Sequence, residues 1–188
     1  MAKGFTETGT FYFYNKKKQS IPIVFIHGVG LTYEIWQPQL DYFNEYSTLS
    51  YDILGHGKSK LEKEIITFDD FSNQLITLID ELKIDKIHLV GFSIGSLIAR
   101  DFASKHNERL QSLILLGSIF KRTDEQQKIV NERYNQAKKQ MKLSKQALKR
   151  WFTDEYLKKN PNTICSLCWN NRSSKERNRT SQSMATST

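Results

Sequence analysis

Ser93 lies between two glycines in the segment G-F-S-I-G, which runs from Gly91 to Gly95. A serine hydroxyl attacks a carbonyl carbon only when it projects freely, and a sharp turn between a strand and a helix achieves this at the cost of backbone strain. Gly91 and Gly95 suit such a turn, because side chains there would collide as the strand and the helix approach each other. The segment is therefore a candidate for nucleophilic catalysis on an acyl group, although a strand, a glycine turn and a helix without catalysis would give the same pattern.

Two segments upstream carry further polar residues next to glycines. The first, H-G-V-G at residues 27–30, directly follows an apolar run. The second, D-I-L-G-H-G-K-S at residues 52–59, follows the short run TLSYD. Both matches strengthen the catalytic interpretation of the segment around Ser93.

Three runs predict strands that are buried on both faces, because they are apolar and do not alternate with polar residues: 21–27, 86–92 and 109–118. This pattern favours a parallel sheet covered by helices. In front of them, residues 9–23 (GTFYFYNKKKQSIPI) predict a β-hairpin of two extended runs joined by a polar turn.

Helical spacing of apolar residues fills the intervals between these runs. The clearest helix follows a Thr67-x-x-Asp70 capping signal. Its apolar face consists of Phe71, Leu75, Leu78, Ile79 and Leu82. Two more helices are expected from the same spacing, one with Trp36, Leu40 and Phe43 and one with Ile94, Ile98 and Phe102. Alternating strands and helices predict a wound α/β sheet.

With these elements in place, the sequence resembles the α/β-hydrolase fold family, whose members carry an H-G-x-G oxyanion loop, a D-x-x-G-H-G-x-S turn and a G-x-S-x-G elbow in this order. The resemblance covers roughly residues 5–160. It implies a mostly parallel sheet with helices on both faces and an N-terminal β-hairpin. The motifs look most like those of the enol-lactonase and esterase branch.

The resemblance implies that Ser93 is the nucleophile and that the backbone N–H groups of Val29 and Ile94 form the oxyanion hole. The other motif residues are expected to be structural: His27, Gly28, Gly30, Asp52, Gly55, His56, Gly57, Ser59, Gly91 and Gly95. His27 precedes the serine, whereas the family order is serine, then acid, then histidine.

A serine hydrolase also needs a base to take the hydroxyl proton and an acid to orient that base. No histidine follows His106, so the base histidine of the family is absent from this sequence. Asp124 is a candidate acid, although at the start of a long helix it also complements the helix dipole or caps the helix. In the family, the sixth strand is followed by a lid and two more strand–helix units. The edge of run 109–118 is therefore expected to be exposed.

Composition divides the chain into three parts. Residues 1–120 are expected to form the N-terminal part of the hydrolase core, without the final strands, and residues 121–164 a helical lid or cap. Residues 165–188 are polar, and we expect a disordered or aberrant tail because ordering them would bury almost nothing. This ending indicates a C-terminal truncation or an out-of-frame end.

The net charge of +8 belongs to the last third of the chain. Residues 1–120 contain 12 Lys and Arg against 14 Asp and Glu, whereas residues 121–188 contain 16 against 6. Without aromatic interleaving, such basic faces favour solvated helices over nucleic-acid binding. No apolar run approaches the roughly 20 residues of a membrane span, and only Cys165 and Cys168 occur. We predict a cytoplasmic protein without disulfides, metal or cofactor.

Two classes of function stay open. The first is hydrolysis of a small carboxyl ester, lactone or related acyl substrate through an acyl-enzyme, weak or lost because the base is missing. The second is a non-catalytic hydrolase-like fragment or a binding module. Carbon–carbon hydrolases and cofactor-free haloperoxidases share these motifs, whereas the serine excludes branches with an aspartate nucleophile. A small acyl molecule is the expected partner, and the exposed sheet edge offers a route to self-association.

Overall fold

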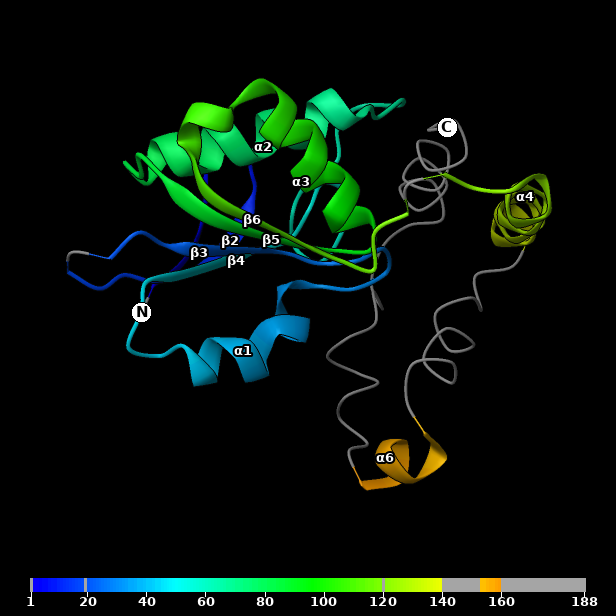
Figure 1. Ribbon diagram of the computed structural model, residues 1–188, viewed down its shortest axis with the longest axis horizontal. Helices are drawn as coiled ribbons and strands as arrows, with labels where there is room; N and C mark the ends of the chain where they lie inside the picture. The colour runs from blue at the N-terminus through cyan, green and yellow to red at the C-terminus, as the bar shows by residue number, and fades with distance from the viewer. Residues whose placement is uncertain (1, 19, 120, 140–152, 160–188) are drawn as a thin grey trace.

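The computed structural model describes residues 2–18, 20–119, 121–139 and 153–159. A six-stranded sheet with the order β1-β2-β4-β3-β5-β6 forms its centre (Figure 1). The strands are β1 (Ala2–Phe5), β2 (Phe11–Asn15), β3 (Ile23–Ile26), β4 (Thr48–Tyr51), β5 (Ile87–Phe92) and β6 (Leu110–Leu116). From β4 to β6 all neighbours run parallel, which confirms the predicted α/β architecture.

Helices lie on both faces of this sheet (Figure 1). One face carries α2 (Phe68–Glu81) and α3 (Ile94–Lys105), and the other carries the 3-10 turn η1 (Tyr33–Trp36) and α1 (Gln37–Tyr42). A second 3-10 turn, η2 (Asn107–Arg109), leads into β6, and α4 (Asp124–Lys139) and α6 (Asp154–Lys159) follow β6. None of the helices in the described ranges is long and apolar enough to cross a membrane.

Side chains that alternate along the buried strands pack into two hydrophobic cores, one on each face of the sheet. Val24 and Ile26 of β3 belong to the larger core under α2 and α3, whereas Phe25 packs with Trp36 and Leu40 on the α1 face. Both faces of β3 are therefore apolar, which explains its unbroken apolar run. The predicted capping box is confirmed at Thr67, whose hydroxyl accepts from the Asp70 N–H while the Asp70 carboxylate accepts from the Thr67 N–H.

The N-terminal hairpin is real, but the prediction assigned the wrong strands to it. β1 and β2 form the antiparallel pair, with Phe5 opposite Phe11. β2 then pairs with β4, and β3 lies beyond β4 rather than beside β2. All four residues of β4 are buried, as its position between β2 and β3 requires.

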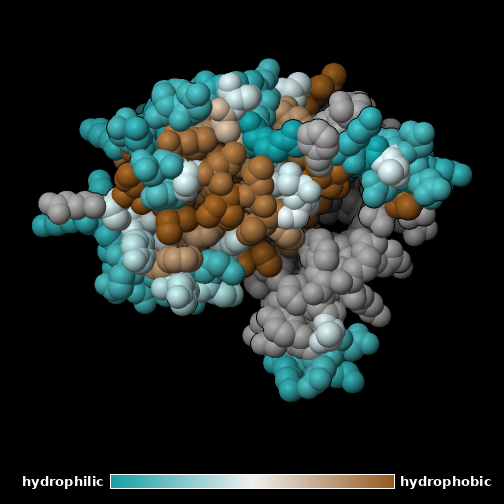
Figure 2. Space-filling view, in the orientation of Figure 1, coloured by the Kyte–Doolittle hydropathy of each residue, from teal (hydrophilic) through white to brown (hydrophobic). Residues whose placement is uncertain are grey.

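Strand β6 differs most from its prediction. Residues 109–118 were expected to be buried on both faces, but Leu113, Ile114, Leu115 and Leu116 are 36–47% exposed. The physical reason is that β6 has only one neighbour, β5, in the described sheet, as the expected exposed edge requires. Figure 2 shows the resulting hydrophobic band across the middle of this face of the molecule.

Candidate active site

Ser93 forms the turn between β5 and α3, as the sequence predicts. β5 ends at Phe92, α3 begins at Ile94, and Ser93 itself has φ 57° and ψ −118°. Two hydrogen bonds hold its backbone: its N–H donates to Leu116 O (2.9 Å), and its carbonyl accepts from the Ser96 hydroxyl (2.6 Å). A non-glycine residue held in the left-handed region is strained, and such strain persists only where the surroundings impose it.

The two flanking glycines allow this turn because backbone fills the space around them. A Cβ at Gly91 would overlap with the carbonyl group of Gly95. A Cβ at Gly95 would lie 2.5 Å from Ile26 O and 2.8 Å from His27 O. α3 can therefore approach β3 and β5 closely only because neither position has a side chain.

The loop after β3 lies directly against the serine. A Cβ placed on Gly28 would lie 3.3 Å from Ser93 Cβ, so Gly28 is in contact with the turn. Val29, the next residue, is 38% exposed, and Ile94 is the first residue of α3. The two segments that carry the predicted oxyanion-hole donors thus meet at Ser93, while the role of their N–H groups stays a prediction.

His27 is buried and held by two hydrogen bonds. Its side chain is fully buried, and Nε2 accepts from the Ile53 N–H (3.1 Å). Nε2 therefore carries no proton, and Nδ1–H donates to Gly28 O at 2.8 Å. Burial lowers the pKa of His27 to about 4, against the hydrogen bond to Gly28, which raises it. A neutral imidazole thus ties the loop beside Ser93 to the segment after β4.

Asp52 organises that second segment from inside the protein. It is 1% exposed, and its two carboxylate oxygens accept from the backbone N–H groups of Tyr33 (2.8 Å) and Lys58 (2.7 Å). A Cβ at Gly57, where φ is 48°, would overlap with this carboxylate. The Ser59 hydroxyl donates to Asp52 O and accepts from the Phe11 N–H. The turn motif is therefore a buried structural network.

Two further residues belong to this network, His56, which the motif includes, and Gln74, which it does not. His56 is buried, and its ring Nδ1 lies 3.1 Å from Leu54 O, in keeping with its expected structural role. Gln74 of α2 was not singled out. Its amide donates to Asp52 O (3.0 Å) and its carbonyl accepts from the Leu54 N–H (3.0 Å). The signal in the sequence that could have identified it is a polar residue next to Leu75 in a helix with an apolar face.

Comparison with known proteins decides the family. The sequence model of the family described as alpha/beta hydrolase fold matches residues 21–177 of this chain. The chain belongs to the α/β-hydrolase fold family.

Two similar proteins of this family have enzyme names. The chain is 31% identical over 147 residues to (E)-2-((N-methylformamido)methylene)succinate hydrolase of Acinetobacter baylyi, a match that covers 78% of this chain and 56% of that protein. It is 29% identical over 158 residues to 3-oxoadipate enol-lactonase 1 of the same organism, covering 81% of this chain and 59% of that protein. The chain thus spans little more than half the length of these two relatives.

Solved α/β-hydrolase structures agree with the fold. A hydrolase from Pseudomonas aeruginosa superimposes with a TM-score of 0.80 at 19% identity, covering 98% of this chain and 72% of that one. The enol-lactonase from Burkholderia xenovorans LB400 gives a TM-score of 0.79 at 21% identity, covering 98% and 74%.

The other two histidines have partners elsewhere in the fold. His88 bonds to Ser112 Oγ of β6 (2.8 Å), and His106 ends α3, where its ring packs on Phe102. Within the described ranges, no hydrogen-bond partner of the Ser93 hydroxyl is found. Cys165 and Cys168 lie outside these ranges, and no group of three metal-binding side chains occurs inside them.

Asp124 is the first residue of α4, but a different pair caps this helix. The Thr123 N–H donates to Gln126 Oε1 (3.0 Å), and the Gln126 N–H donates to Thr123 Oγ1 (3.3 Å). Asp124 therefore supplies a charge to the first turn rather than the cap, as its place in the helix dipole suggests. Its role as a catalytic acid stays a prediction.

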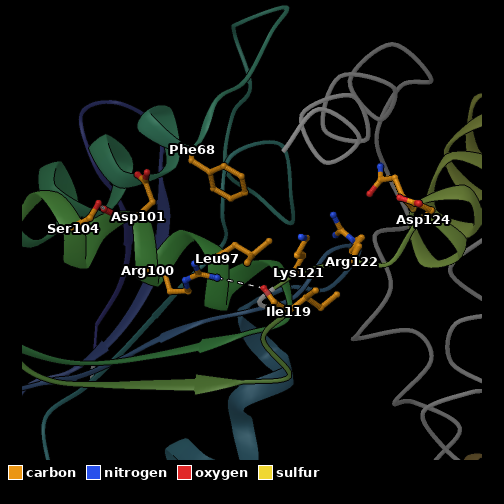
Figure 3. A pocket seen from close by; sticks show the side chains of 10 residues that line it. Phe68, Leu97, Arg100, Asp101, Ser104, Ile119, Lys121, Arg122 and Asp124 are labelled. Atoms are coloured by element: carbon orange, nitrogen blue, oxygen red, sulfur yellow. Dashed lines mark hydrogen bonds between the residues drawn. The ribbon is translucent and has the colours of Figure 1, made fainter. Parts of the chain in front are cut away.

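Two cavities flank the turn without including Ser93. The first, of about 580 Å³, lies between α3 and the segment after β6, and its charged lining includes Arg100, Lys121 and Arg122 (Figure 3). The Arg100 guanidinium donates to Ile119 O across it (3.3 Å). The second, of about 400 Å³, is mainly apolar and lies on the α1 face beside β6.

Acidification is expected to destabilise the fold through His27. The imidazole has a pKa of 6.5 when unfolded and about 4 when folded, so between these values the unfolded chain binds a proton that the folded chain does not. The stabilisation is complete above pH 6.5 and is lost as the pH falls toward 4, an effect of about 3 kcal/mol. Urea unfolding at pH 7 and pH 4.5 measures it. His27→Gln should be less stable at pH 7, but its free energy of unfolding should fall less between pH 7 and pH 4.5. An equal fall in both proteins would show that His27 does not cause the acid sensitivity.

Proposed function

We propose that this protein is a serine hydrolase of a small carboxyl ester, lactone or related acyl compound. One observation carries the proposal: Ser93 is a half-buried serine in a strained strand-to-helix turn, in contact with the Gly28 loop. Its hydroxyl is not engaged with any residue of the described ranges and is available to a substrate.

The reaction that this arrangement supports has two steps. Ser93 Oγ attacks the carbonyl carbon, the bond to the leaving alkoxide breaks, and that alkoxide takes the serine proton by way of a base or solvent. Water then attacks the acyl-serine, which releases the acid and restores the hydroxyl. The negative charge that forms on the carbonyl oxygen is stabilised by the N–H groups of Val29 and Ile94, beside the N-terminus of α3.

The relatives support a small substrate. The names of two of them, a substituted succinate hydrolase and a 3-oxoadipate enol-lactonase, both refer to small acids. The partner that we propose is therefore a small acyl molecule rather than a nucleic acid or a membrane.

Turnover by this chain should be slow, because none of its four histidines is placed to take the proton of Ser93. Oxyanion stabilisation alone leaves only a small part of triad catalysis. The same absence favours the alternative, a non-catalytic hydrolase-like fragment or binding module that keeps the pocket.

Two measurements on the purified protein separate these functions. Hydrolysis of p-nitrophenyl acetate should proceed far below the ~1 per second of an ordinary enzyme, and it should fall to the buffer rate in Ser93→Ala. A fluorophosphonate should label Ser93 slowly, as peptide mass spectrometry detects. Ser104→Ala is the control, since Ser104 is exposed and bonds only its own helix. Equal rates in the protein and in Ser93→Ala would favour the binding module, and fast Ser93-dependent turnover would contradict the expected weakness.

A further inference from the structure

Phe92, the last residue of β5, precedes Ser93, and its ring lies between two loops. Its atoms Cδ1 and Cε1 lie 3.1 and 3.2 Å from the position that a Cβ on Gly28 would take. The opposite edge of the ring faces Gly117, with Cε2 3.6 Å from the corresponding Cβ position. The ring therefore fills the space between the loop after β3 and the segment after β6.

Gly28 also brings this ring next to the serine side chain. Ser93 Cβ lies 3.3 Å from the Cβ position of Gly28, so the ring and the serine border the same small space in front of this glycine. A carbonyl group that Ser93 attacks, with its oxygen toward the Val29 N–H, lies beside that space. The Phe92 ring is then one of the surfaces that the substrate meets.

The burial of Phe92 leaves part of its ring open to a ligand. Val90, two residues earlier on the same face of β5, is 6% exposed and belongs to the core on the α1 face. Phe92 packs against that core but is only half-buried. Ligands of parallel α/β sheets bind beyond the carboxyl ends of the strands, which is where β5 places this ring.

We propose that Phe92 restricts the acyl side of the site, so that the protein favours esters and lactones of short, uncharged acyl groups over those with long chains. This inference rests on the proposed hydrolase function. The three segments that meet at Ser93, 26–31, 90–95 and 114–118, contain no Asp, Glu, Lys or Arg. A ring in this space excludes further methylene groups by steric overlap, and one methylene in an apolar pocket changes kcat/KM by roughly 10–200-fold.

Two p-nitrophenyl esters with the same leaving group test this selectivity in the full chain. The measured quantity is kcat/KM for the hexanoate divided by kcat/KM for the acetate, from p-nitrophenolate release after subtraction of the Ser93→Ala rate. Phe92→Ala should raise this ratio by about tenfold or more over the unmodified protein, because the acyl chain can enter the space of the ring. Phe92→Leu, which keeps more of the side chain and disturbs the core less, should raise the ratio by a smaller factor.

Phe43→Ala is the matched control, because Phe43 is also a partly buried phenylalanine packed on the same core but lies at the end of α1. It should leave the ratio unchanged, and circular dichroism checks the fold of each variant. An unchanged ratio in both Phe92 variants, with Ser93 still labelled by a fluorophosphonate, would overturn this inference and leave the proposed function standing. An equal rise in Phe43→Ala would also overturn it, since a loosened core would then be the cause. If Ser93 is neither labelled nor needed for p-nitrophenolate release, both proposals are wrong.

Discussion

Gly95→Ala is expected to lower the free energy of unfolding by about 3 kcal/mol or more, the upper range of overpacking. The added methyl group would lie 2.5 Å from Ile26 O and 2.8 Å from His27 O, and both contacts are with backbone that cannot turn aside. β3 and α3 must then separate, and the close contact of Gly95 with β3, which positions the turn at Ser93, is lost. Because a domain of this size has only about 5–15 kcal/mol of stability, much of the population should unfold on mild heating.

Gly30→Ala is the matched control for Gly95. Gly30 also lies in the active-site region, but its Cβ position meets nothing within 4 Å, and only its φ of 71° opposes a side chain. Its cost should be about 1–2 kcal/mol of backbone strain. Urea unfolding of both variants measures the difference. Equal losses would mean that conformation, rather than the close approach of α3 to β3, accounts for the glycine at position 95.

Asp52→Ala is expected to cost about 2–5 kcal/mol, since each buried N–H left without an acceptor costs about 1–3 kcal/mol. The backbone N–H groups of Tyr33 and Lys58 are among the groups that lose their acceptor. Tyr33 begins the 3-10 turn before α1, so the loss spreads from the turn motif to the loop beside Ser93.

Asp41→Ala provides the comparison, because Asp41 is an exposed helix residue bonded to Gln37 alone among the described side chains. Its removal should change the free energy of unfolding by no more than about 0.5 kcal/mol. Thermal melts and urea titrations of both variants give the two values. A loss at Asp52 no larger than that at Asp41 would show that water replaces the carboxylate without cost.

Local patterns were sufficient for the residues around Ser93. A buried run, a glycine on each side of the serine and an apolar helical repeat act within about fifteen residues, so they fix the turn without knowledge of the rest of the fold. The same holds for the capping box of Thr67 and Asp70, whose two partners lie three residues apart.

Pairings over long distances were beyond such patterns. The polar run that follows β2 resembles a hairpin turn, yet β4 lies between β2 and β3. β6 is as apolar as a central strand, because sequence composition does not show whether a neighbour is present. Gln74 bonds residues 20 and 22 positions earlier, and only the folded chain brings them together. The cap of α4 is a different case, because its signature is local: Thr123-x-x-Gln126 is a capping box, which was overlooked in favour of Asp124.

The hydrogen bond from the Ser93 N–H to Leu116 O joins the strained turn to β6, one of the two edge strands of the described sheet. Native proteins open locally at far lower free energy than they unfold, and an edge strand held on one side is among the first parts to open. Each fraying event at the end of β6 releases the Ser93 amide to solvent and removes one of the restraints that keep its φ positive. We therefore expect the turn at Ser93 to open together with the end of β6, at a lower free energy than the buried core below it requires.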